Sequence, residues 1–178
     1  MKKECLIIAA SAGVGKSYLG KKYKNVLDLE SSPFRWTNKG LENLSEGEQK
    51  GLDRGELNPN WPQNYIDKLL ISRNKYDIIL IPIPHETMMA KEIGDYLTSQ
   101  NMVFYIAMPT EESIETILKR LKDRGNEDDF VDYIRTNYPV IINEFTRDKC
   151  NLLTILDGEY LEDTLIRYGM LGDLNEQR

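Results

Sequence analysis

The feature that most constrains this chain is a short glycine-rich segment near its N-terminus. Residues 10–17 read Ala-Ser-Ala-Gly-Val-Gly-Lys-Ser, directly after an apolar run over 6–10. Gly-Lys-Ser after such a run predicts a strand, a tight loop and a helix, with backbone N–H groups turned inward around phosphate oxygens. Alanine stands first where the strict pattern has glycine, a substitution that the wider motif accepts. The segment is therefore a phosphate-binding P-loop, and we expect the chain to bind a nucleoside triphosphate.

Each residue type in this loop suits ATP with magnesium. Glycine adopts the positive φ of the tight turn, and the helix that follows directs its positive end at the phosphates. We expect Lys16 to reach the β- and γ-phosphates and the Ser17 hydroxyl to ligate Mg²⁺. A glycine-rich turn without a ligand is the alternative, which the strand–loop–helix context disfavours. The residues expected to hold ATP are Ala12, Gly13, Val14, Gly15, Lys16, Ser17 and Tyr18.

Apolar runs and helical patterns alternate along the rest of the chain. Strands separated by helices need crossover connections, which give a parallel sheet with helices on both faces. The expected fold class is an α/β P-loop NTPase three-layer sandwich with a five-stranded parallel sheet. The strands are expected at 6–10, 25–30, 76–82, 102–108 and 151–156, and the helices include 85–100 and two further helices over 128–137 and 139–148.

The composition indicates one soluble domain. Of 178 residues, 40% are hydrophobic and 29% charged, a balance that supports a single core. A net charge of −6 disfavours nonspecific binding to nucleic acid, which depends on clustered Lys and Arg. No apolar run is long enough to span a bilayer, so we expect a cytoplasmic protein that does not bind membranes. We expect one domain over 1–171 and a polar tail over 172–178, and the sequence does not indicate an oligomeric state.

Two arginines lie one helical turn apart late in the chain. Arg120 and Arg124 face one side of a helix end, and Gly125 follows as a stop signal. This Arg-x-x-x-Arg helix resembles the start of the lid in the nucleoside monophosphate kinase family and its small P-loop kinase relatives. The resemblance implies that Arg120 lies against the adenine of ATP, that Arg124 binds phosphates, and that a lid lies near 120–130. A solvated basic helix end is the alternative.

Two carboxylates, Asp28 and Glu30, end the second expected strand. The carboxyl edge of a parallel sheet faces the ligand crevice, and alternation places both side chains on one face. In the small P-loop kinases that the chain resembles, an acidic residue here contacts the acceptor hydroxyl or magnesium. Either is therefore a candidate general base or outer magnesium ligand, and a solvated strand end is the alternative. The family also carries an acidic residue after the third strand, where this chain has none over 82–85, so how magnesium is held stays open.

A polar segment over 37–63 interrupts the alternating pattern. Long loops in compact domains are usually lids or binding segments, so we expect an insertion that binds the acceptor. The stretches 28–36 and 58–65 also resemble a group of phage-encoded, nucleotide-kinase-like P-loop proteins. Aromatic rings there can stack on a base and Arg35 can hold a monophosphate. Packing of the insertion is the alternative for both tryptophans, and a partly exposed helix cap is the alternative for the histidine. The expected acceptor residues are Ser31, Ser32, Arg35, Trp36, Trp61, Asn64, Tyr65 and His85.

Together these features predict an ATP-dependent kinase whose small-molecule acceptor is a nucleoside or deoxynucleoside monophosphate. One alternative is a P-loop ATP-binding or ATPase module that regulates a partner, with the insertion as its docking surface. Another is a kinase of a non-nucleotide metabolite or of a modified base in DNA. The departure after the third strand favours the regulatory module, whereas the arginine pair and the two carboxylates favour the kinase.

Overall fold

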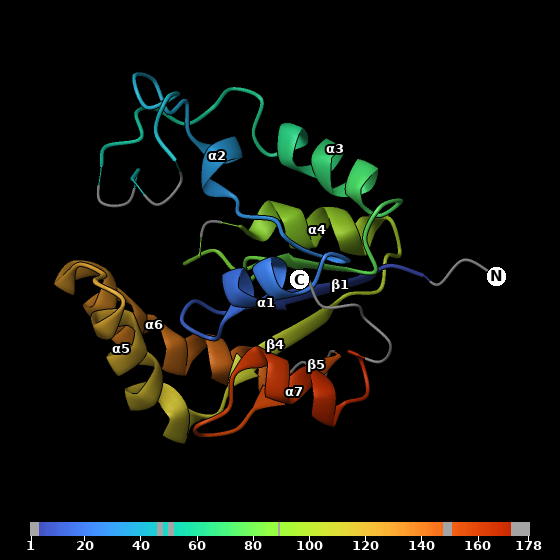
Figure 1. Ribbon diagram of the computed structural model, residues 1–178, viewed down its shortest axis with the longest axis vertical. Helices are drawn as coiled ribbons and strands as arrows, with labels where there is room; N and C mark the ends of the chain where they lie inside the picture. The colour runs from blue at the N-terminus through green and yellow to red at the C-terminus, as the bar shows by residue number, and fades with distance from the viewer. Residues whose placement is uncertain (1–3, 46–47, 50–51, 89, 148–150, 172–178) are drawn as a thin grey trace.

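The chain folds around one parallel β-sheet (Figure 1). The computed structural model describes residues 4–45, 48–49, 52–88, 90–147 and 151–171. The described strands form a single sheet in the spatial order β2-β3-β1-β4-β5, and every neighbouring pair is parallel. This confirms the predicted α/β P-loop fold with a five-stranded parallel sheet. The strands are β1 (Leu6–Ala10), β2 (Val26–Asp28), β3 (Ile78–Ile81), β4 (Tyr105–Pro109) and β5 (Leu152–Ile155).

Helices cover both faces of the sheet. They are α1 (Lys16–Lys22), α2 (Ser32–Arg35), α3 (Gln63–Ser72), α4 (Lys91–Ser99), α5 (Ile114–Asp123), α6 (Asp128–Arg147) and α7 (Leu161–Arg167), and a 3-10 turn, η1 (Glu111–Ser113), precedes α5. From β1 the chain moves to the β2 edge, and from β2 onward it moves the opposite way to β5. Right-handed crossovers therefore place α1 on one face and the helices before β3, β4 and β5 on the other. α7 returns to the face of α1, where Lys22 and Glu162 form an ion pair of 2.8 Å.

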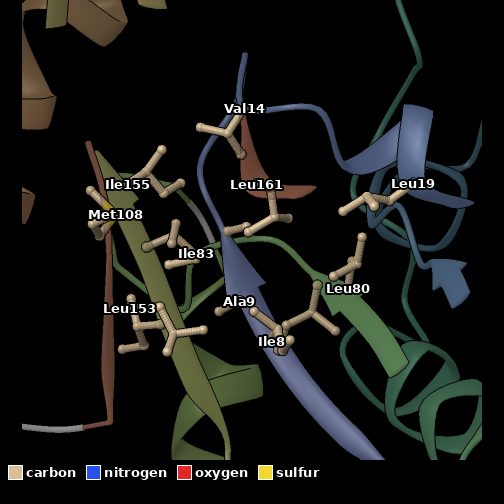
Figure 2. Close-up of a cluster of buried hydrophobic side chains, with 14 of the residues drawn as sticks. Ile8, Ala9, Val14, Leu19, Leu80, Ile83, Met108, Leu153, Ile155 and Leu161 are labelled. Carbon is tan, nitrogen blue, oxygen red and sulfur yellow. The ribbon is translucent and has the colours of Figure 1, made fainter. Parts of the chain in front are cut away.

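Apolar side chains fill the space beneath the P-loop (Figure 2). Ile8 and Ala9 of β1 are fully buried, as expected for a strand covered on both faces. Figure 2 shows Val14 of the loop, Leu19 of α1 and Leu161 of α7 gathered around the carboxyl end of β1. All three are also fully buried. The loop is therefore anchored in the core through its own valine.

The helix predicted over 85–100 begins later than expected, at Lys91. His85 forms a turn instead, in which its carbonyl accepts from the N–H groups of Met88 and Ala90. The N–H of Thr87 donates to the ring Nδ1 of the same histidine at 3.3 Å. These local bonds satisfy the backbone without a helix, so the prediction for the first six residues is wrong.

The two helices predicted on either side of Pro139 are one continuous helix, α6. Proline inside a helix removes one N–H donor and costs about 3 kcal/mol. Val131, Ile134, Tyr138 and Ile141 along α6 are all fully buried, and the packing of this face outweighs that cost. No described helix is both long and apolar enough to cross a lipid bilayer.

The segment between α2 and α3 lies at one end of the long axis of the molecule, whereas α5, α6 and α7 lie toward the other (Figure 1). In the described part of 37–62 there is no helix and no strand longer than a single bridge. That bridge pairs Trp36 with Leu57 in antiparallel fashion. The backbone of the segment is held chiefly by local turns, which is the character that the sequence predicts for an insertion.

Candidate functional site

The P-loop between β1 and α1 presents a row of unused backbone donors. Gly13 and Gly15 have φ angles of 80° and 103°, in the left-handed region that favours glycine. Among the described residues, no backbone or side-chain acceptor receives a hydrogen bond from the N–H groups of 13–18. Consecutive free N–H groups in a tight turn that opens a helix form a cradle for phosphate oxygens. The cofactor residues predicted from the motif lie together in this cradle.

Three helices or their flanking residues fix the loop from outside. A Cβ at Gly13 would come within 3.1 Å of Ile117 Cγ2 on α5, so glycine is needed for this close approach. The N–H of Leu161, at the start of α7, donates to the Val14 carbonyl at 2.8 Å. The hydroxyl of Tyr138 on α6 accepts from the Ala12 N–H at 2.6 Å. Contacts with the fold therefore define the shape of the loop.

Lys16 folds back over the beginning of its own loop. Its Nζ donates to the carbonyls of Ala10 and Ser11, each at 2.9 Å. The charge also acts on Asp28, because it lowers the pKa of that carboxyl against the effect of burial. The predicted phosphate-binding lysine thus lies beside the free N–H groups and next to a carboxylate.

Ser17 and Asp28 are joined directly across the site. Ser17 Oγ donates to Asp28 Oδ2 at 2.7 Å. Gly20 allows α1 to approach β2 here, because a Cβ at this position would lie 3.1 Å from the Cβ of Asp28. Desolvation raises the pKa of Asp28 above its ordinary value, although Lys16 and the hydrogen bond from Ser17 oppose the shift. A hollow of about 290 Å³ between α1 and β2 reaches the same pair from the edge of the sheet.

The Ser17–Asp28 pair fits a magnesium ion. A hydroxyl and a carboxylate are the hard oxygen ligands that Mg²⁺ prefers, with waters and phosphate oxygens completing an octahedron. Asp28 Oδ1 is buried and has no hydrogen-bond partner among the described residues, so it retains unused acceptor capacity beside the hydroxyl. The described residues contain no cluster of three or more His, Cys, Asp or Glu side chains that could hold a metal.

Asp28 supplies a carboxylate beside the P-loop, although the chain has none directly after the third strand. The residues that follow β3, Pro82 to His85, include no carboxylate. Because β2 is the neighbour of β3 in the sheet, the end of β2 lies one strand away from that position. Asp28 reaches the P-loop serine from there. The carboxylate beside the Ser17 hydroxyl, which is predicted to bind magnesium, is thus supplied by a different strand.

Glu30 lies two residues beyond Asp28, which is the last residue of β2. It follows in irregular backbone and is half-buried. Within the described chain Glu30 makes no ion pair. Burial is the main cause that raises the pKa of Asp28 and of Tyr65, and the charge of Glu30 adds to both shifts. The charge of Asp28 acts on Tyr65 as well, and the shared face of the two carboxylates stays a prediction.

The two lid arginines have different partners. Arg120 donates to the carbonyls of Glu159 and Gly158 at 2.8 and 2.9 Å, and its guanidinium lies 3.8 Å from the centre of the Tyr160 ring. Arg124 is exposed, and its Nε donates to Asn126 Oδ1 at 2.9 Å. Arg120 is thus fixed against the β5–α7 loop, whereas Arg124 stays at the exposed turn between α5 and α6.

The β5–α7 loop contributes residues that the sequence prediction missed. Tyr160 lies beside the P-loop, since a Cβ at Gly15 would be 3.4 Å from Tyr160 Cδ1. Glu159 organises the loop through hydrogen bonds from Arg167 Nε and Nη2 and from the Leu156 N–H. The bond from Arg167 is the main reason why the pKa of Glu159 falls from 4.5 to about 2. No local sequence pattern predicts this loop, because its partners come from α5 and the P-loop.

Arg35, at the end of α2, lies between two indole rings. Its guanidinium carbon is 5.1 Å from the ring centre of Trp36 and 5.4 Å from that of Trp61. The guanidinium therefore lies over both rings, as expected if the tryptophans pack the insertion. Burial lowers the pKa of Arg35, and the charge of Glu92 on α4 opposes that effect. The structure brings these three predicted acceptor residues together.

The other predicted acceptor residues brace α2 against α3. Tyr65 is fully buried, and its hydroxyl donates to the Leu29 carbonyl at 2.8 Å. Asn64 Nδ2 donates to the Phe34 carbonyl at 2.7 Å. Ser31 is the residue before α2, and its carbonyl accepts from the first turn, while Ser32 begins the helix. Tyr65 and Asn64 therefore stabilise the packing of α3 against the chain from Leu29 to Phe34.

His85 has both ring nitrogens engaged. Nε2 lies 2.6 Å from Glu144 Oε2 on α6, and Nδ1 lies 2.9 Å from Thr87 Oγ1. The side chain therefore joins the turn after β3 to α6. It is not a cap of the following helix, because α4 begins six residues later.

The similarity to known proteins supports the fold and carries no information on activity. No protein-family model matches the sequence, and no curated protein matches it. Among solved structures, the tunicamycin resistance protein of Deinococcus radiodurans is similar, with a TM-score of 0.54 and 17% sequence identity. The match covers 98% of this chain and 99% of that one. At this identity the similarity describes the fold alone, and it extends over nearly the whole chain.

Proposed function

We propose that the protein is an ATP-dependent phosphotransferase whose acceptor is a nucleoside or deoxynucleoside monophosphate. The observation that carries the proposal is the row of unused N–H donors over 13–18, beside Lys16 and the Ser17–Asp28 pair. Phosphoryl transfer depends on positioning and charge neutralisation more than on covalent chemistry by the protein. Preorganised donors aimed at the phosphates supply both.

In the proposed reaction an oxygen of the acceptor attacks the γ-phosphorus, the bond to the β–γ bridging oxygen breaks, and ADP leaves. Lys16 exchanges the carbonyls of its own loop for β- and γ-phosphate oxygens. Bound magnesium would neutralise charge on those oxygens, with Ser17 and Asp28 on its protein side. Arg124 is exposed beside the α5–α6 turn, where closure would bring it to the transferred group. For a hydroxyl acceptor, Glu30 takes the proton, whereas a phosphate oxygen needs no base.

The acceptor would bind at the other side of the crevice, against α2. The Arg35 guanidinium lies 5.1 and 5.4 Å from the centres of two indole rings, and its charge suits it to the acceptor phosphate. Arginine can bind phosphate in a bidentate manner. This arrangement favours an anionic acceptor over a neutral one.

A regulatory ATPase module is the second candidate. It is favoured by the absence of a carboxylate over 82–85 and by exposed leucines in the insertion, Leu44, Leu52 and Leu57. The solved structure is named for resistance to an antibiotic, so acceptors other than mononucleotides also belong in any test.

The deciding experiment is a coupled assay of ADP release with MgATP and the common NMPs and dNMPs. We expect one or a few acceptors to raise the rate at least tenfold above the basal rate in a saturable manner. A Lys16→Ala protein purified in the same way controls for contaminating kinases. If no acceptor raises the rate and basal hydrolysis is retained, the proposal of a mononucleotide acceptor is wrong. The same assay with non-nucleotide hydroxyl compounds then decides between another acceptor and the regulatory module.

A further inference from the structure

One buried side chain of α6 reaches the backbone of the P-loop. The Tyr138 hydroxyl accepts from the Ala12 N–H at 2.6 Å and donates to the Ala12 carbonyl at 3.3 Å. The side chain is fully buried, and the two residues are 126 positions apart in the sequence. The contact therefore joins the first part of the P-loop to the helix that follows the predicted lid.

The two bonds act on the peptide groups that lead into the phosphate cradle. The peptide between Ser11 and Ala12 is held on both sides, because its carbonyl accepts from Lys16 Nζ and its N–H donates to Tyr138. The next peptide contains the Ala12 carbonyl and the Gly13 N–H. In a trans peptide these two groups point in opposite directions. Holding the carbonyl toward α6 therefore directs the Gly13 N–H away from α6 and toward the phosphate site.

The position of Tyr138 also relates the loop to the lid turn. α6 begins at Asp128, directly after the turn that carries Arg124. Burial raises the pKa of the Tyr138 hydroxyl, and the charge of Arg124 opposes that effect. The hydroxyl thus stays protonated and can donate at neutral pH. It joins the P-loop backbone to the helix that follows the turn of Arg124.

We propose that Tyr138 is a positioning residue, whose hydroxyl holds the Ala12 peptides so that the Gly13 N–H faces the phosphates. The inference rests on the proposed function for the identity of the anion, MgATP. The ordering of the loop by Tyr138 does not depend on that identity. Movement of α6 would consequently be transmitted to the phosphate cradle through one hydroxyl.

The test compares Tyr138→Phe with Tyr23→Phe. Both substitutions keep the ring and remove one hydroxyl; Tyr23 lies at the end of α1, is 8% exposed and donates to Glu162 Oε1 at 2.6 Å. We expect Tyr138→Phe to raise hydrogen exchange of the Ala12 amide about tenfold without ligand, and to weaken MgATP binding about tenfold by calorimetry. Tyr23→Phe should lower the melting temperature by a similar amount and change neither quantity.

The outcomes separate this inference from the proposed function. Unchanged exchange of the Ala12 amide in Tyr138→Phe overturns the inference, whether or not the wild-type chain binds MgATP. Faster exchange with an unchanged MgATP dissociation constant also overturns it, because the ordered loop would then have no role in binding. If the wild-type chain binds no MgATP, the proposed function fails, and the exchange result alone decides whether Tyr138 orders the loop.

Discussion

The P-loop and the segment from α2 to α3 are held in place by different kinds of contact. The P-loop is fixed by α5, α6, α7 and β2, which all come from other parts of the sequence. The segment from α2 to α3 is held by its own neighbours, through the bridge between Trp36 and Leu57 and the bond from Asn64 to Phe34. The site proposed for ATP is therefore built into the core, whereas the segment proposed to bind the acceptor is held mainly by contacts within itself.

This difference has a consequence for specificity. A loop held by local contacts tolerates substitution and insertion far better than a loop packed into a core. The same sheet and P-loop can therefore serve different acceptors, and changes at the two ends should affect different kinetic parameters. The following predictions test that separation.

The largest effect is expected at the Ser17–Asp28 pair. Asp28→Asn removes the charge that fits magnesium, and changes of this kind typically cost 10–100-fold in metal affinity or activity. We expect about a 100-fold lower kcat with MgATP. Glu30→Gln is the comparison, because Glu30 does not contact Ser17, and we expect it to affect transfer only to hydroxyl acceptors. Equal losses in both variants with a phosphate acceptor would contradict a special role for the carboxylate that is bonded to Ser17.

At the acceptor end, a smaller and more selective effect is expected. Arg35→Ala removes the guanidinium between two indole rings, and we expect the acceptor KM to rise about tenfold. The MgATP dissociation constant should stay the same, because the P-loop does not contact Arg35. Arg73→Ala, at the end of α3, is the control and should leave both values unchanged. A weaker affinity for MgATP in Arg35→Ala would show that the two ends are coupled.

The smallest effect concerns the pH dependence of stability at the β5–α7 loop. Hydrogen bonds from Arg167 hold the pKa of Glu159 at about 2 in the folded chain, below its ordinary value of 4.5. The stabilisation is therefore complete above pH 4.5 and is lost as the pH falls toward 2. We expect the melting temperature of wild type to exceed that of Glu159→Gln at pH 7, and the difference to shrink below pH 4.5. A difference of the same size at pH 7 and at pH 3 would rule out a role for the charge.

The sequence predicts the parts of the site that depend on short-range patterns. The P-loop and all five strands follow from apolar runs and from one motif, because these elements are specified by neighbouring residues. Tyr138 and Tyr160 could not be predicted, since their partners lie in distant elements and nothing in their local sequence differs from core or surface residues. The continuous α6 was also missed, because tertiary packing overrides the local effect of Pro139.

The residues predicted to bind the acceptor show that residue type alone does not identify a binding site. Trp36 and Trp61 were predicted to stack on a base, and in the structure the Arg35 guanidinium lies over both rings. Tyr65 was predicted to help build the acceptor pocket, but its side chain is fully buried. Side chains that can bind a ligand can also pack against one another. Only the three-dimensional structure distinguishes a residue that binds a ligand from one that packs within the protein.

The central claim is that the free N–H groups over 13–18, with Lys16 and the Ser17–Asp28 pair, bind the phosphates of MgATP. Calorimetric titration of the wild-type chain and of Lys16→Ala with MgATP tests it most directly. We predict binding with a micromolar dissociation constant in wild type and at least 100-fold weaker binding in Lys16→Ala, with the fold retained by circular dichroism. Equal affinity in the two proteins, or no binding to the folded wild-type chain, would contradict the account.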